Sequence, residues 1–147
     1  MLTVRRARAA DLDRMVALLR VLFTLEADFG VDRDKQRRGL RLLLEDDRAC
    51  LLVAEEESGV IGMCSGQLVI STAEGGPALL VEDVVVDESF RGRGVGRLLM
   101  EALQNWAATV NATRLQLLAD RNNAAALDFY QGLGWKHTDL ICLRTHR

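Results

Sequence analysis

The chain has 147 residues, of which 49% are hydrophobic, and a formal net charge of −2 at pH 7. This length leaves room for one domain around one hydrophobic core. The charge gives no support for nucleic-acid binding, and no apolar run is long enough to span a bilayer. The N-terminal residues lack the pattern of a signal peptide, so a cytoplasmic protein is expected. The three cysteines are scattered, which favours neither a disulfide framework nor a zinc site.

Apolar periodicity and turn residues divide the chain into alternating strands and helices. The run at residues 78–86 is apolar on both faces, as expected for a strand in the middle of a sheet. A strand–helix–strand order follows, which requires a parallel crossover that should be right-handed. In chain order the predicted elements are a strand at 2–6, a helix capped by Asp11, a second helix ending near Asp46, a hairpin of strands 50–56 and 59–70, the strand at 78–86, a long helix at 95–110, a strand at 113–119, a short helix at 123–131 and a strand near 138–143.

The segment that joins the buried strand to the long helix is rich in glycine and arginine. Glycine lets the chain turn sharply and brings its N–H groups close to a ligand. Those N–H groups then lie at a helix N-terminus, where they lack internal partners and carry the positive end of the helix dipole. Arginine adds charge that binds phosphate oxygens through two donors. The segment therefore predicts an anion site formed by Arg91, Gly92, Arg93, Gly94, Gly96 and Arg97.

Two common phosphate-binding motifs do not fit this segment. A Walker loop requires Gly-Lys-Ser/Thr, whereas Gly96 is followed by Arg97. A dinucleotide-binding turn requires G-x-G-x-x-G, and Arg97 holds the place of the third glycine. That turn also expects an acidic residue about 20 positions further on, and Asp120 comes late for this role. The segment does match R-x-x-G-x-G/A, with Arg91, Gly94 and Gly96 at the defined positions.

A second signature follows about 30 residues downstream and is more specific in combination with the first than either is alone. It has the form N-x-x-A-x-x-F-Y followed by G-x-G-[FW], and it is present as Asn123, Ala126, Phe129, Tyr130, Gly132, Gly134 and Trp135. With both motifs in this order, the chain resembles the GNAT superfamily of acyl-CoA-dependent N-acetyltransferases. The resemblance covers almost the whole chain and is strongest from Leu80 to Trp135.

The resemblance implies an α/β (α+β) fold in a single domain over residues 1–147. Its central sheet should be mixed and mostly antiparallel, flanked by about four helices and containing one parallel β-α-β crossover. Acetyl-CoA is implied as the cosubstrate, without a metal. By analogy with the family, the cofactor-binding residues are expected to be Val84, Val86, Arg91, Gly92, Arg93, Gly94, Val95, Gly96, Arg97 and Asn123. Asn123 begins a short helix, so it can also serve as its N-cap.

The resemblance also suggests catalytic residues. Acetyl transfer requires a deprotonated amine, and an alkylamine with a pKa near 10.4 is protonated at neutral pH. Glu82 lies where polyamine acetyltransferases carry a strand carboxylate, in a strand that also reads E-D, and is the candidate base. Tyr130 is the candidate acid for the departing thiolate, and the N–H of Val84 is expected to bind the oxyanion. The alternatives are that Glu82 and Asp83 cap a bulge or pair with arginines, and that Tyr130 is only packed.

The acceptor side is expected to be acidic. Asp28 and Asp32 lie between the first two helices, and Asp83 is a further candidate for binding the acceptor. Such carboxylates would attract a cation, such as a polyamine, an amino sugar or a lysine side chain. The acids between the helices can equally serve the helix dipole and cap.

Three functions therefore remain open. The leading one is acetylation of a primary amine on a small molecule. A protein N-terminal or lysine acetyltransferase is the second, and a non-catalytic acyl-CoA-binding sensor is the third. A homodimer through the last strands is possible in each case, because an exposed sheet edge permits pairing.

Overall fold

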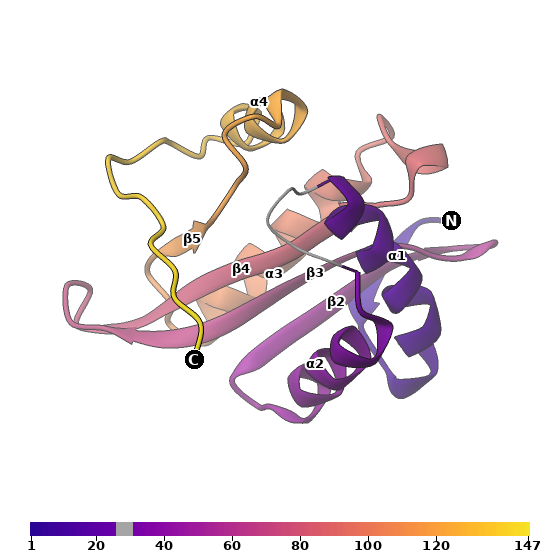
Figure 1. Ribbon diagram of the computed structural model, residues 1–147, viewed down its shortest axis with the longest axis horizontal. Helices are drawn as coiled ribbons and strands as arrows, with labels where there is room; N and C mark the ends of the chain where they lie inside the picture. The colour runs from indigo at the N-terminus through magenta and orange to yellow at the C-terminus, as the bar shows by residue number, and fades with distance from the viewer. Residues whose placement is uncertain (26–30) are drawn as a thin grey trace. The chain divides into compact units, whose positions relative to one another are not determined.

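A computed structural model describes residues 1–25 and 31–147. The chain divides into two compact units, Met1–Leu117 and Leu118–Arg147, and each is described by itself. The first unit contains, in chain order, β1 (Thr3–Arg6), the 3₁₀ turn η1 (Ala9–Asp11), α1 (Leu12–Leu25), α2 (Arg33–Glu45), β2 (Ala49–Glu56), β3 (Gly59–Ser71), β4 (Gly76–Val86), the 3₁₀ turn η2 (Glu88–Phe90), α3 (Val95–Thr109) and β5 (Leu115–Leu117) (Figure 1). The second unit contains α4 (Ala124–Gly132). That residues 1–147 form one domain stays a prediction.

The sheet of the first unit has five strands in the order β1-β2-β3-β4-β5. The three pairings from β1 to β4 are antiparallel, and β4 pairs with β5 in parallel. The predicted mixed sheet and its parallel crossover, made through α3, are therefore confirmed. β4 lies between β3 and β5, as its apolar sequence predicted.

Helices cover both faces of this sheet (Figure 1). On one face, leucines and valines of α1 and α2 pack against inward side chains of β2, β3 and β4 in the main hydrophobic core. On the other face α3 approaches β3 so closely that a Cβ on Gly62 would lie 3.2 Å from Leu99 and 3.3 Å from Val95. Within residues 1–25 and 31–147, no helix is long and apolar enough to cross a membrane.

Two predicted strands differ from the structure. β5 spans only Leu115–Leu117 because it pairs with β4 at three positions, Leu79 to Val81. The strand predicted near residues 138–143 is wrong, since that stretch of the second unit has no regular structure. Its leucines and isoleucine favour extended backbone, but a strand also needs a partner to satisfy its N–H and C=O groups. In the described chain this stretch has no ladder partner.

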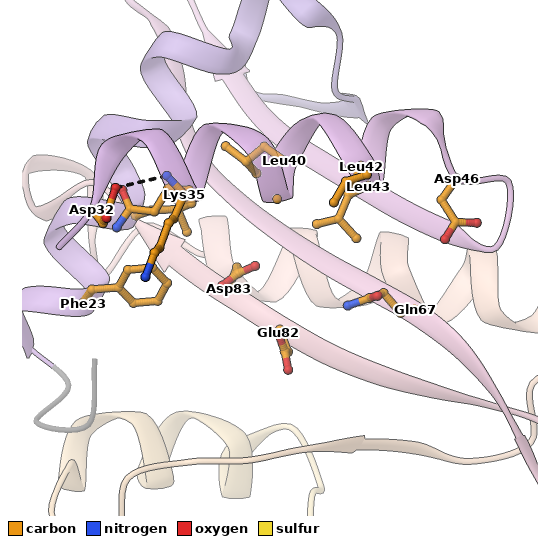
Figure 2. Close-up of a pocket in the computed structure, with 13 residues that line it drawn as sticks. Phe23, Asp32, Lys35, Leu40, Leu42, Leu43, Asp46, Gln67, Glu82 and Asp83 are labelled. Carbon is orange, nitrogen blue, oxygen red and sulfur yellow. Dashed lines mark hydrogen bonds between the residues drawn. The ribbon is translucent and has the colours of Figure 1, made fainter. Parts of the chain in front are cut away.

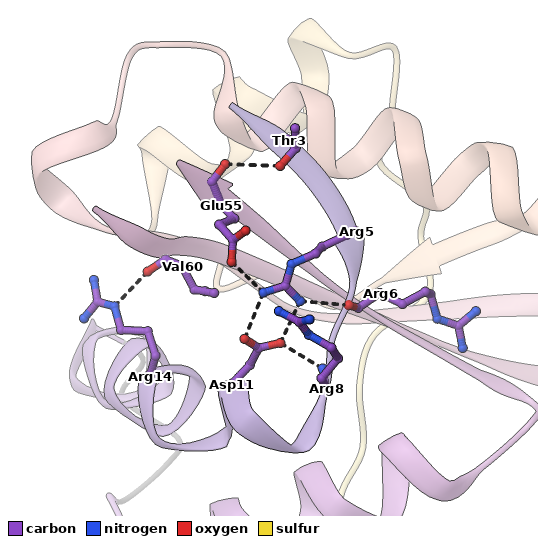
Figure 3. Close-up of polar contacts among 8 residues, drawn as sticks. All are labelled: Thr3, Arg5, Arg6, Arg8, Asp11, Arg14, Glu55 and Val60. Carbon is purple, nitrogen blue, oxygen red and sulfur yellow. Dashed lines mark hydrogen bonds and ion pairs between the residues drawn. The ribbon is translucent and has the colours of Figure 1, made fainter. Parts of the chain in front are cut away.

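Arg5 joins the first strand to its neighbours by ion pairs (Figure 3). Its guanidinium donates to both carboxylate oxygens of Asp11, at 2.8 and 3.0 Å, and to Glu55 at 2.6 Å. These bonds raise the pKa of Arg5 and lower the pKa values of Asp11 and Glu55. Asp11 was predicted to be an N-cap, but it lies at the end of η1 and its carboxylate accepts the N–H of Arg8 at 2.8 Å. The Asp11 carboxylate reaches back to the start of the turn because the helical segment begins at Ala9, three residues before the predicted start at Leu12.

We expect Asp11→Ala to lower the free energy of unfolding at pH 7 by about 2 kcal/mol, since Arg5 loses its charged hydrogen bonds to this carboxylate. For a chain of this size, this equals a fall in Tm of about 4–8 °C. The lowered pKa of Asp11 means that its contribution is present above the unfolded-state pKa, near 4, and is lost as the pH falls through the folded-state pKa. Urea unfolding of the wild type and of Asp11→Ala between pH 7 and pH 2 checks this expectation. The difference between their free energies of unfolding should shrink as the pH falls.

Asp13→Ala is the matched control. Asp13 also pairs with an arginine, Arg37, but its side chain is 87% exposed. The control should keep the wild-type Tm because exposed ion pairs contribute little. An equal loss of stability in both variants would contradict the role given to the Arg5–Asp11 pair.

Candidate functional site

The glycine- and arginine-rich segment forms the N-terminus of α3. Gly92 and Gly94 have φ angles of 76° and 81°, in the left-handed region that only glycine adopts readily. Gly94 is the N-cap and has no side chain to cap the helix. The first helical hydrogen bond runs from the N–H of Leu98 to the carbonyl of Gly94. The preceding N–H groups of Val95 to Arg97 therefore have no partner within the helix, and they suit an anion.

The three arginines of the segment are exposed. Arg91 donates through Nε to the carbonyl of Val86 at 3.2 Å, which draws it against the end of β4. Arg93 lies over the ring of Phe90, with its guanidinium carbon 5.2 Å from the ring centre. Arg97 lies in the first turn of α3. All three positive charges thus belong to the residues that lead into α3 or form its first turn.

Asp87 holds the start of this segment in place. Its carboxylate accepts the N–H of Ser89 at 3.0 Å and pairs with Arg14 of α1, and both contacts lower its pKa. Its own N–H donates to the carbonyl of Ile61 on β3 at 2.7 Å. The turn after β4 is therefore fixed to the sheet and to α1.

β4 carries a bulge where its two acidic residues lie. The register with β3 shifts so that Met63 faces Val85 while Ser65 faces Glu82. One extra residue of β4 is thereby accommodated between these pairs. Asp83 has a φ of 56°, which is uncommon for a residue with a side chain but tolerated by aspartate. The bulge interrupts the regular alternation of side chains along β4.

A pocket of about 470 Å³ opens beside this bulge, within the first unit. Figure 2 shows Asp83 pointing from β4 toward α2, whereas Glu82 points away from that helix. Four carboxylates and one ammonium group contribute polar atoms to a wall that is otherwise largely apolar. The lining residues are Leu19, Phe23, Asp32, Lys35, Gln36, Gly39, Leu40, Leu42, Leu43, Asp46, Gln67, Glu82 and Asp83.

β4 extends beyond the strand that flanks it. β5 pairs with Leu79 to Val81 and stops, whereas β4 continues to Val86 along β3. β5 therefore does not cover the β4 edge at Glu82–Val86, where main-chain N–H and C=O groups can pair with an extended ligand. This stretch runs from the pocket to the glycine- and arginine-rich segment.

The second unit contains the other two predicted site residues. Asn123 is the N-cap of α4, because its side chain accepts the N–H of Ala126 at 3.1 Å. The ring of Tyr130 lies edge-on to that of Phe129, with centres 5.1 Å apart, and 5.8 Å from that of Trp135. Asn123 thus has the capping role that its position predicted, and Tyr130 belongs to an aromatic cluster.

Within the first unit the structure brings together most of the predicted site. Glu82, Asp83 and Asp32 line one pocket, and Asp32 also caps α2 by accepting the N–H of Lys35 at 3.1 Å. Asp28 lies outside the described residues. No group of three or more His, Cys, Asp or Glu residues is placed to hold a metal ion in the described chain.

Sequence reasoning missed three polar residues near the bulge. Gln36 of α2 is 8% exposed, and its amide has no hydrogen-bond partner among the described residues. Gln36 of α2 and Gln67 of β3 both line the pocket, and Ser65 of β3 contacts Asp83 of the bulge through its hydroxyl. Gln36 is a polar residue on the buried face of α2, one turn before Leu40, and the other two lie in an apolar strand. The sequence carried no signal that Gln36 and Gln67 face a common cavity, or that Ser65 contacts the bulge.

The sequence profile of the acetyltransferase (GNAT) family matches residues 12–135. The aminoglycoside N(6′)-acetyltransferase type 1 of Salmonella typhimurium is 22% identical over 102 residues, which cover 67% of this chain and 70% of that protein.

Solved structures of similar fold include a possible acetyltransferase from Clostridium difficile 630. It has a TM-score of 0.87 and 22% identity, with 100% of this chain and 98% of that chain covered. An aminoglycoside N-acetyltransferase in complex with CoA has a TM-score of 0.86 and 21% identity, with 100% and 95% covered. At such identities these likenesses support the fold alone.

Proposed function

Because the chain belongs to the acetyltransferase (GNAT) family and is therefore an N-acetyltransferase, we propose that it acetylates a primary amine of a small cationic molecule with acetyl-CoA. One observation carries this proposal: β4 leads from an acidic pocket at its bulge to an uncapped helix N-terminus with three arginines. A cationic acceptor and an anionic donor would thus meet along one strand. GNAT enzymes use acyl-CoA, and CoA is bound in the similar aminoglycoside N-acetyltransferase.

In this proposal the donor binds along β4 and at the start of α3. The N–H groups of Val95, Gly96 and Arg97 receive the pyrophosphate, whose charge the arginines of the segment balance. Gly92 and Gly94 allow the backbone to approach the phosphates. The pantetheine arm pairs with the β4 edge near Val84 and Val86, which β5 leaves uncovered. Asn123 adds a contact to this arm besides capping α4.

The reaction is a direct transfer within a ternary complex. The amine nitrogen attacks the thioester carbonyl carbon, a C–N bond forms, and the C–S bond then breaks. Glu82 takes the amine proton, directly or through water, because it is an exposed carboxylate at the pocket. The N–H of Val84 stabilises the oxyanion, and Tyr130 returns a proton to the thiolate.

The acceptor is proposed to be small because the pocket is limited in volume and lies between α1, α2 and the sheet. Its carboxylates favour an ammonium group, and its leucines and Phe23 favour an apolar body next to that group. The aminoglycoside acetyltransferase of Salmonella typhimurium gives a reason to include amino sugars among the candidates. Polyamines and peptides that end in a free amine complete the panel.

A thermal melt with acetyl-CoA tests the donor first. Ligand at a hundredfold excess over Kd stabilises by about 2.7 kcal/mol, which raises Tm by about 5–10 °C for this chain length. A panel of amines is then screened by the release of the CoA thiol. No rise in Tm at millimolar acetyl-CoA would contradict the proposal, and so would turnover with peptides alone.

Tyr130→Phe separates an enzyme from a sensor. We expect kcat to fall about tenfold to a hundredfold, because the departing thiolate then has no phenol to protonate it. The effect is limited since thiols are weak acids, with a pKa near 8.5 for cysteine, so a thiolate can leave without full protonation. The Kd of acetyl-CoA should change less than twofold. Phe129→Leu alters the same aromatic cluster without removing a hydroxyl, so an equal fall in kcat there would assign Tyr130 to packing.

A further inference from the structure

The bulge in β4 is in hydrogen-bond contact with one buried side chain of the neighbouring strand β3. Ser65 of β3 is 1% exposed and faces Glu82 in the register of the two strands. Its Oγ lies 3.1 Å from the carbonyl oxygen of Glu82 and 3.3 Å from Oδ2 of Asp83. Both acceptors belong to the bulge, and the hydroxyl shares its one proton between the main chain of the bulge and its acidic side chain.

This contact restrains the Asp83 carboxylate in the orientation that the structure shows. The φ of 56° at Asp83 sends its side chain from the strand into the pocket. A side chain that is restrained before the ligand binds costs less free energy to order on binding. When the hydroxyl donates to Asp83 rather than to the carbonyl oxygen of Glu82, the acceptor is charged, which makes the bond stronger than one between neutral groups. The bond from Ser65 therefore favours one orientation of the carboxylate before the acceptor arrives.

We propose that Ser65 is a positioning residue that holds the Asp83 carboxylate ready to bind the ammonium group of the acceptor. This inference rests on the proposed function, because it concerns how that pocket receives an amine. Ser65 is too deeply buried to touch the acceptor, so it acts through Asp83. Asp83 binds the ammonium group, while Glu82, which lines the same pocket but points away from α2, takes the proton.

Ser65→Ala is expected to raise KM for the amine about tenfold, the effect of losing one hydrogen bond to a charged group. The value of kcat should change less than threefold, and the Kd of acetyl-CoA less than twofold. Steady-state kinetics at a temperature well below Tm measures this split, which a general loss of stability would not produce. Ser65→Thr keeps the hydroxyl and should keep KM within threefold of the wild-type value.

Ser71→Ala is the matched control on the same strand. Ser71 is also buried, at 8% exposed, and its hydroxyl accepts the N–H of Glu74 in the turn before β4. This variant should lower Tm without changing KM. If Ser65→Ala does not fold, Ser65→Cys replaces the hydroxyl with a weak donor of similar size and should raise KM in the same direction.

A double-mutant cycle with Asp83→Asn tests whether Ser65 acts through Asp83. Asparagine tolerates the left-handed backbone but carries no charge. Adding Ser65→Ala to Asp83→Asn should change KM less than twofold further, because the carboxylate that Ser65 orders is already absent. The proposal would be overturned if the double variant raised KM by the product of the two single effects. It would also be overturned if Ser65→Ala left KM unchanged. Absence of wild-type turnover with every amine would instead overturn the proposed function, and the role of Ser65 with it.

Discussion

Glu82→Gln is expected to lower kcat about 10³-fold at pH 7, while the Kd of acetyl-CoA stays within twofold of the wild-type value. Glutamine keeps the size of the side chain but cannot accept a proton, and general-base catalysis typically contributes about 10²–10⁴-fold. The side chain is exposed at the pocket, so the substitution should not disturb the core. Rates of CoA release at saturating amine measure the change.

The pH dependence gives a second measurement of the same variant. An alkylamine loses its proton near pH 10.4, so the variant should regain rate as the pH rises toward 9 or 10. The ratio of wild-type to variant rates should shrink over that range. Glu101→Gln, on the exposed side of α3, is the control and should keep full activity. A kcat for Glu82→Gln within threefold of the wild-type value would assign Glu82 to the structure of the bulge or to binding.

Gly94→Val is expected to weaken acetyl-CoA binding by about 10²-fold or more. The φ of 81° at this N-cap places a β-branched residue in the left-handed region, which costs roughly 1–2 kcal/mol even where space is open. The segment would change its backbone to relieve this strain, and the N–H groups of α3 would lose their alignment on the phosphates. Calorimetric titration with acetyl-CoA, and with CoA itself, measures the loss.

Gly75→Val is a closely matched control for that change. Gly75 has a φ of 72° and equally open surroundings, but it lies in the turn before β4, at the opposite end of the strand. Both variants should lose a few degrees of Tm, and only Gly94→Val should lose affinity for acetyl-CoA. Equal affinities in the two variants would show that the N-terminus of α3 is not the pyrophosphate site.

The candidate donor site was predictable because the sequence features that form it lie within a few residues of one another. A glycine-rich turn before an amphipathic helix presents N–H groups to an anion whatever the rest of the chain does. Gly92, Gly94 and the start of α3 at Val95 therefore appeared where the sequence placed them. The central position of β4 in the sheet was also predictable, since a strand with apolar residues on both faces is expected to be covered on both sides.

The candidate acceptor site was only partly predictable because its residues are distant in the sequence. Glu82 was identified through the family resemblance and Asp83 and Asp32 by their charge, but Gln36, Gln67 and the apolar wall of the pocket were not predicted. These residues meet only when α1 and α2 pack on the sheet. The bulge that turns Asp83 into the pocket, with Ser65 beneath it, results from a one-residue shift in the register of β3 and β4.

The sequence by itself thus determined the order of the main elements, the family and the segment at the start of α3. Periodicity, turn residues and helix termini act within a few residues of one another, so a single sequence reveals them. Only the tertiary structure decided the pocket, the bulge and the length of β5, because each depends on which strands pair and in what register. The strand predicted at residues 138–143 was wrong for the same reason: extended propensity is local, but pairing is not.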